Sequence, residues 1–88
     1  MAKPYCIEAA QLGDTFVGNT DDLRRFADIL TDIVARDHPM AKRMVELGDD
    51  VFIVRVHIEQ PADAITPTDA QWQDALDRLA SERPHTFK

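Results

Sequence analysis

The sequence predicts an α+β fold in which helices cover one face of a small sheet of two or three strands. The segment 51–59 alternates its side chains over a β-branched run, which is the pattern of a strand with one buried face. The segments at about 20–37 and 66–82 carry apolar residues at spacings of three and four, as amphipathic helices do. A chain of 88 residues accommodates these elements in a single domain, 1–88.

The strand predicted at 51–59 has two unlike faces. The face expected beneath the helices carries Phe52, Val54, Val56 and Ile58. The opposite face carries Val51, Ile53, Arg55, His57 and Glu59. One end of this second face is apolar, so we expect another surface to cover it.

The N-terminal segment 3–11 also alternates and predicts a first strand, followed by a turn at Gly13-Asp14. The short stretch 15–17 is a candidate return strand, which would form a hairpin with the first. Including it, the expected order of elements is β-(β)-α-α-β-α.

Three helices are expected from apolar spacing and end signals. Asn19 or Thr20 caps the first helix. A second helix is expected at 39–47, with Pro39 in its first turn and an apolar stripe ended by Gly48; the stripe consists of Met40, Met44 and Leu47. Thr66 to Asp69 resembles a capping box for the last helix, and 84–88 is expected to be a flexible tail.

Charge and composition exclude several classes of function. The net charge of −6 disfavours direct nucleic-acid binding, because phosphate backbones repel such a chain. The longest apolar run, 51–54, is far shorter than a membrane span, and the N-terminus does not resemble a signal peptide. We therefore expect a cytoplasmic protein that does not bind membranes. A single cysteine cannot form an internal disulfide.

No motif in the sequence predicts a catalytic site or a cofactor. Cys6 could act as a nucleophile beside a histidine, but no local signature accompanies it, and a small buried side chain on a strand is the favoured interpretation. The three histidines lack the spacings of metal ligands, so no metal is expected. Arg55, His57 and Glu59 could support proton transfer, although a solvated strand face with cross-strand ion pairs is the simpler interpretation.

Acidic residues form a second candidate surface. Asp69, Asp74 and Asp77 lie along the last helix, where a row of carboxylates could imitate spaced phosphates. Ordinary solvation and helix capping also explain such residues.

The first functional hypothesis is a small acidic protein-binding domain, an inhibitor or adaptor, which could cover a basic nucleic-acid-binding site on another protein. The alternative is a homodimeric domain that binds a small ligand or carries a minor catalytic activity on the face of Arg55, His57 and Glu59. A DNA regulator with a helix-turn-helix at 20–47 is a third, weaker hypothesis.

Overall fold

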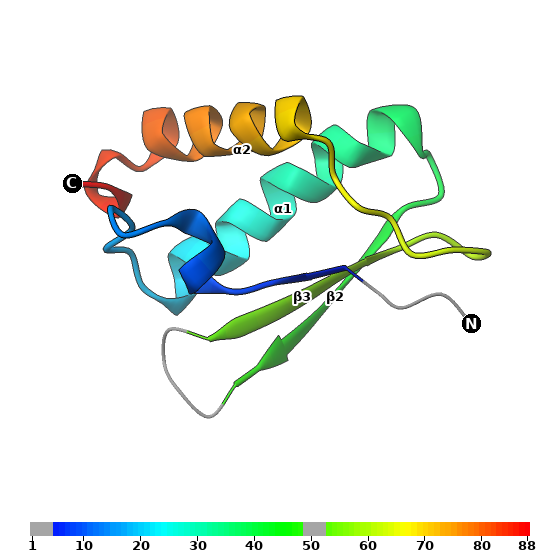
Figure 1. Ribbon diagram of the computed structural model, residues 1–88, viewed down its shortest axis with the longest axis horizontal. Helices are drawn as coiled ribbons and strands as arrows, with labels where there is room; N and C mark the ends of the chain where they lie inside the picture. The colour runs from blue at the N-terminus through cyan, green and yellow to red at the C-terminus, as the bar shows by residue number, and fades with distance from the viewer. Residues whose placement is uncertain (1–4, 49–52) are drawn as a thin grey trace.

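The computed structural model describes residues 5–48 and 53–88 and confirms the α+β fold, with both helices on one side of a three-stranded antiparallel sheet (Figure 1). The elements in chain order are β1 (Tyr5–Ile7), the 3₁₀ turn η1 (Ala9–Leu12), α1 (Thr20–Asp37), β2 (Lys42–Leu47), β3 (Val54–Glu59), α2 (Asp69–Glu82) and the 3₁₀ turn η2 (Pro84–Thr86). The strand order is β1-β3-β2, so β3 is central and β2 forms one edge.

The two faces predicted for the central strand are present in β3. Val54, Val56 and Ile58 are buried beneath the helices, whereas Arg55 is exposed. The pairing with β1 places Tyr5 opposite Ile58 and Cys6 opposite His57. Val51 and Phe52 lie outside the described residues.

The first helix has the bounds that its sequence predicts. Asn19 caps α1 by accepting a hydrogen bond from the Asp22 N–H, and one stripe of the helix enters the core. The buried apolar residues of α1 are Leu23, Phe26, Ala27, Ile29, Leu30, Ile33 and Val34. This stripe lies against β2 and β3 on one side and against α2 on another.

The helix expected at 39–47 is wrong, because Lys42–Leu47 forms strand β2. The residues of the expected apolar stripe do not enter the core: Met40, Met44 and Leu47 are 61%, 51% and 65% exposed. As a strand, the segment instead pairs along the whole of β3, and the Gly48 N–H donates to the Ile53 carbonyl at 2.9 Å to close the hairpin. The helix-turn-helix hypothesis lacks its second helix and is also wrong.

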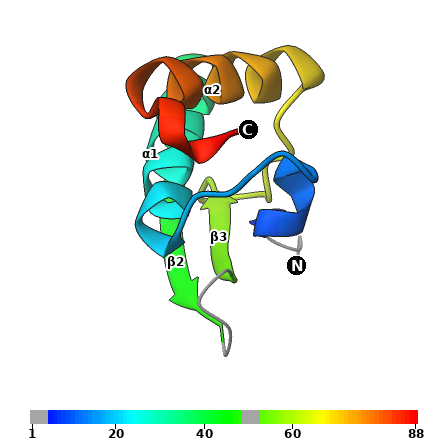
Figure 2. The same ribbon diagram turned by 90° about the vertical axis from the view of Figure 1, so that its left-hand side faces the viewer.

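The two ends of the chain also differ from expectation. Within the strand expected at 3–11, β1 is followed by η1, and Phe16 forms its bridge with Phe87 rather than with β1. The segment 84–88, expected to be a flexible tail, packs beside the link from β1 to α1 (Figure 2). The Thr86 side chain is fully buried, and its carbonyl accepts the Val17 N–H at 2.8 Å. This packing satisfies backbone groups of both segments.

The last helix ends as predicted but begins later. Thr68, not Thr66, caps α2, and the side chain that completes the capping box is Gln71 rather than Asp69. Trp72 packs edge-on against Phe26 with ring centres 5.1 Å apart. Among the described residues, no helix has an apolar stretch that could span a bilayer.

Candidate functional site

The sheet has an outer face, defined here as the side away from the helices, and three strands contribute to it. β3 supplies Arg55, His57 and Glu59, because the residues between them point into the core. In antiparallel pairing, residues directly opposite share a face. β1 therefore adds Cys6, and β2 adds Lys42, Met44 and Glu46.

The middle row of the outer face consists of Cys6, His57 and Met44, one residue from each strand. The Cys6 Sγ atom lies 3.8 Å from His57 Nδ1. Met44, on the other side of the imidazole, is 51% exposed. Only 16% of the His57 side chain is exposed, although neither helix packs on this face. The middle row is therefore less polar than is typical of a strand face exposed to solvent.

Charged residues flank the middle row on both sides. Arg55 lies opposite Glu46 in the sheet, and its Nε atom is 3.6 Å from Glu8 Oε1. Beyond His57, Lys42 lies opposite Glu59. Among the described residues these flanking groups include three glutamates, Glu8, Glu46 and Glu59, and two cations, Arg55 and Lys42, so they have a slight negative charge.

His57 has an incompletely satisfied ring nitrogen. Its Nε2 atom is buried and lies 3.6 Å from Glu46 Oε2, which is close enough for electrostatic attraction but too long for a hydrogen bond. No described residue hydrogen-bonds this atom. Such a group gains from any partner that supplies a donor or acceptor.

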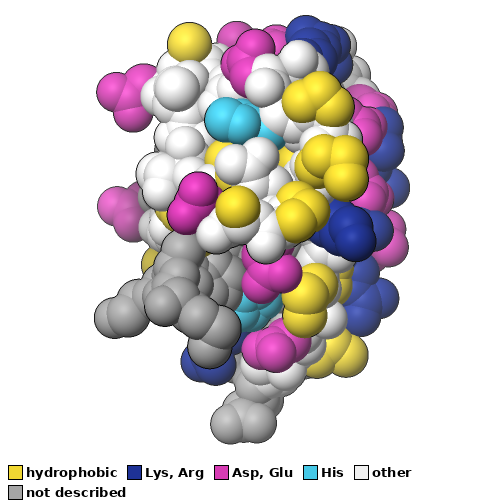
Figure 3. All heavy atoms as spheres, turned by 90° about the vertical axis from the view of Figure 1, so that its right-hand side faces the viewer, with side chains coloured by type: hydrophobic (Ala, Val, Ile, Leu, Met, Phe, Trp, Pro, Cys, Tyr) yellow, Lys and Arg dark blue, Asp and Glu magenta, His cyan; other side chains and the backbone are white. Residues whose placement is uncertain are grey.

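The exposed edge of the sheet, β2, carries apolar side chains on both of its faces. Leu47, at the end of β2, is 65% exposed, and Met40, in the turn between α1 and β2, is 61% exposed. Figure 3 shows the side of the molecule that carries this turn, where hydrophobic side chains stand among acidic ones. Large apolar side chains are therefore concentrated along β2.

The residues predicted to bind a partner do not form one surface. Asp69, Asp74 and Asp77 lie on α2, which is separated from the outer face by α1 and the sheet (Figure 1). Arg78 pairs with Asp74 at 3.3 Å, and the Gln73 amide donates to Asp77 at 2.9 Å. Of the apolar end of the face, Ile53 is partly buried beside Gly48 and Val51 lies outside the described residues.

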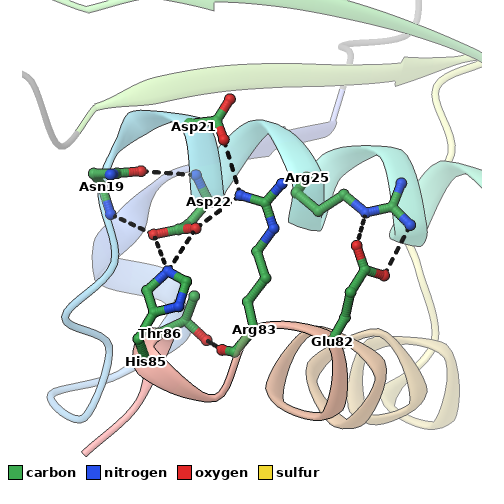
Figure 4. A network of polar contacts seen from close by, with 8 residues as sticks. All are labelled: Asn19, Asp21, Asp22, Arg25, Glu82, Arg83, His85 and Thr86. Carbon is green, nitrogen blue, oxygen red and sulfur yellow. Dashed lines mark hydrogen bonds and ion pairs between the residues drawn. The ribbon is translucent and has the colours of Figure 1, made fainter.

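A second polar cluster joins the C-terminal segment to the start of α1 (Figure 4). The Asp22 side chain is 2% exposed and accepts the Asn19 N–H at 2.9 Å. Arg83 Nη1 donates to Asp22 at 2.9 Å, and His85 Nε2 lies 3.1 Å from the same oxygen. Arg83 also pairs with Asp21. The sequence predicted Asn19 as a candidate cap of this helix. No sequence pattern placed Arg83 and His85 beside it.

Several opposing effects set the pKa of the Asp22 carboxyl. Burial alone raises this pKa, but hydrogen bonds from Asn19, Arg83 and His85, together with the charge of His85, lower it, and the pKa lies below its ordinary value of 3.8. Asp22 is therefore ionised at neutral pH and fully partnered, as a structural group is.

Within residues 5–48 and 53–88, no three side chains among His, Cys, Asp and Glu gather as a set of metal ligands. In comparisons with known proteins, the chain matches no family model, no curated protein and no solved structure. Functional arguments therefore depend on the geometry of the outer face.

Proposed function

We propose that this chain is a protein-binding domain, an inhibitor or adaptor, that docks on another protein through the outer face of its sheet. The observation that supports this most directly is the middle row of Cys6, His57 and Met44 between two charged rows. Protein interfaces have the same composition, with a weakly polar centre and a charged rim. The buried His57 Nε2 adds a polar atom that a partner can complete.

The charge of the chain favours a partner with a basic surface. The net charge is −6, and Glu8, Glu46 and Glu59 outnumber the cations of the outer face. A basic surface that otherwise holds nucleic acid is one such target. The carboxylates of α2 support this less well, because Asp74 and Asp77 are engaged within the helix.

A photo-crosslinking residue at position 55 tests the proposal in the cells that produce the protein. We expect it to capture one specific partner, identified by mass spectrometry, because the Arg55 side chain is 53% exposed at the rim of the face. The same residue at position 77, on α2, is the matched control. Equal capture from both positions, or capture from neither, would contradict the proposal.

With the captured partner purified, charge reversal tests the surface quantitatively. Glu59→Lys should raise the dissociation constant roughly tenfold, because the new positive charge at the rim repels a basic partner. Asp77→Lys makes the same change in net charge on α2 and should leave binding within about twofold. If the two substitutions weaken binding equally, only the net charge matters and the outer face is not the docking surface.

A second candidate function rests on the 3.8 Å contact between Cys6 and His57. The imidazole could accept the thiol proton while the sulfur attacks a small electrophilic ligand, with Glu46 near the far ring nitrogen. Iodoacetamide is a suitable probe: the sulfur forms a bond to carbon, iodide leaves, and the proton passes to His57. Alkylation of Cys6 should be several-fold slower in His57→Phe near pH 7, and equal rates in the two proteins would contradict this function.

A further inference from the structure

Strand β2 has the properties of an edge that pairs with another strand. It is six residues long, contains neither proline nor glycine, and pairs with β3 in continuous register without a bulge. Five of its six residues are exposed. Proteins that keep such edges unpaired usually shorten, bend or interrupt them or place charged side chains on them, and of these devices β2 has only the charged side chains.

A two-fold axis perpendicular to the sheet allows few registers between β2 and a second copy of itself. The axis keeps both outer faces on the same side only if one residue of β2 lies directly opposite the same residue of the other copy. We name each register by that residue, through which the axis is said to pass. An axis through Arg43 places two arginines opposite each other, and one through Glu46 places two glutamates opposite each other. An axis through Val45 sets Met44 against Glu46. Like charges or apolar-to-charged contacts disfavour all three.

The register centred on Met44 is complementary across the outer face. Lys42 of each copy lies opposite Glu46 of the other, and the two Met44 side chains meet between these ion pairs. On the helix side, Leu47, which is 65% exposed, lies opposite the partly buried Ala41 of the other copy. Arg43 lies opposite Val45 of the other copy, but its charge is already engaged by Asp28 of its own chain, unlike a carboxylate placed against Met44.

From this complementarity we infer that the chain forms a homodimer through antiparallel pairing of β2 with β2 of a second copy, centred on Met44. The three strands of each copy then make one continuous six-stranded sheet. The dimer covers the long edges and leaves only β1, three residues in each copy, at the ends of the sheet. The two middle rows join at Met44 into a single row across the outer face. This dimer does not depend on the proposed binding of another protein.

Charge reversals at the two ends of the pairing test the register without relying on one variant. Lys42→Glu places two carboxylates together at each end of the dimer, and Glu46→Lys places two ammonium groups together. Each variant alone should dimerise roughly tenfold more weakly than the wild type, since two attractive pairs become repulsive. An equimolar mixture should recover the wild-type affinity, because in the mixed dimer a carboxylate again faces an ammonium group at both ends.

Sedimentation equilibrium of the wild type, the two variants and their mixture measures the dimerisation affinity, and circular dichroism checks that each variant is folded. The mixture uses the same two chains as the separate samples, so recovery cannot arise from changes in folding. Asp77→Lys, on α2, is the control and should dimerise like the wild type. A wild-type chain that stays monomeric at all concentrations, as expected if β2 pairs with a different protein, would overturn the inference. So would a mixture that remains as weak as its components.

Discussion

The Asp22 cluster and the outer face each contain a buried polar group, the Asp22 carboxylate and the His57 Nε2 atom. The two groups differ in whether they have hydrogen-bond partners. Asp22 is 2% exposed and has partners from Asn19, Arg83 and His85. The His57 side chain is 16% exposed, yet its Nε2 atom is buried and has no hydrogen bond from any described residue. A buried polar group that is fully partnered stabilises the fold, whereas one that is not leaves room for an external partner.

The first test of this difference is Asp22→Ala, for which we expect the largest effect. The substitution removes one half of the α1 capping box, leaves His85 without its carboxylate and leaves Arg83 with Asp21 alone. The free energy of unfolding should fall by about 2–4 kcal/mol, measured by urea denaturation. Asp21→Ala is the control: Asp21 also pairs with Arg83 but is 75% exposed, so its loss should cost less than about 1 kcal/mol. Equal costs would contradict a structural role specific to Asp22.

A methyl group at Gly18 should disturb the Asp22 cluster, because it would clash with the Asp22 side chain. A Cβ atom there would lie 2.8 Å from both Asp22 Oδ2 and Phe16 Cζ. Gly18→Ala should therefore cost about 1–3 kcal/mol and speed amide exchange at Asn19 and Asp22. Gly13→Ala is the comparison, because its φ of 92° strains the backbone while no atom lies within 4 Å. Gly13→Ala should destabilise the fold without speeding exchange at the Asn19 and Asp22 amides. Faster exchange at these amides in both variants would show that the effect is not specific to Gly18.

Acid should weaken the Asp22 cluster in a defined pH range. The folded pKa of Asp22 lies below 3.8, so its ionised form contributes stability above that pH, and the contribution is lost as pH falls through the folded pKa. The difference in unfolding free energy between the wild type and Asp22→Asn should shrink as the pH falls from about 5 towards 3. Urea denaturation at these pH values measures it. A difference that grows on acidification would reverse the sign and contradict the lowered pKa.

The sequence predicted elements well where burial and end signals agreed. The first helix has both a continuous apolar stripe and the Asn19 cap, and β3 has a strict alternation of Val54, Val56 and Ile58. In each case, a local pattern and the tertiary environment favour the same structure.

The same signals failed at β2, because an edge strand with both faces exposed has no alternation to show. Met40, Met44 and Leu47 have helical spacing by coincidence, and most of the residues between them are good helix formers. Pairing with β3 outweighs this preference, since tertiary context commonly overrides local propensity.

The candidate site depends on register, which a single sequence does not contain. The outer position of Arg55 and His57 follows from alternation in β3, but the contact between Cys6 and His57 joins residues 51 positions apart. Whether Asp69, Asp74 and Asp77 share that face depends on which side of the sheet α2 occupies, and no residue pattern in α2 specifies this. The Asp22 cluster was missed for the same reason, because the C-terminal segment reaches the start of α1 through tertiary contacts, which include the Val17–Thr86 hydrogen bond and the packing of Phe87 on Phe16.

The smallest effect on stability is expected at His57. Replacing it with Phe removes an unsatisfied buried nitrogen and keeps a ring of similar size, so unfolding free energy should stay within about 1 kcal/mol of the wild type or rise. His57→Gln retains a polar group in the same place and should be the less stable of the two. Urea denaturation ranks the variants, and binding of the captured partner should be weakened in His57→Phe even though the fold is intact. A Phe variant that loses as much stability as Asp22→Ala would show that His57 is as fully partnered as Asp22, and the outer face would then lack the incomplete polar group on which its role in docking depends.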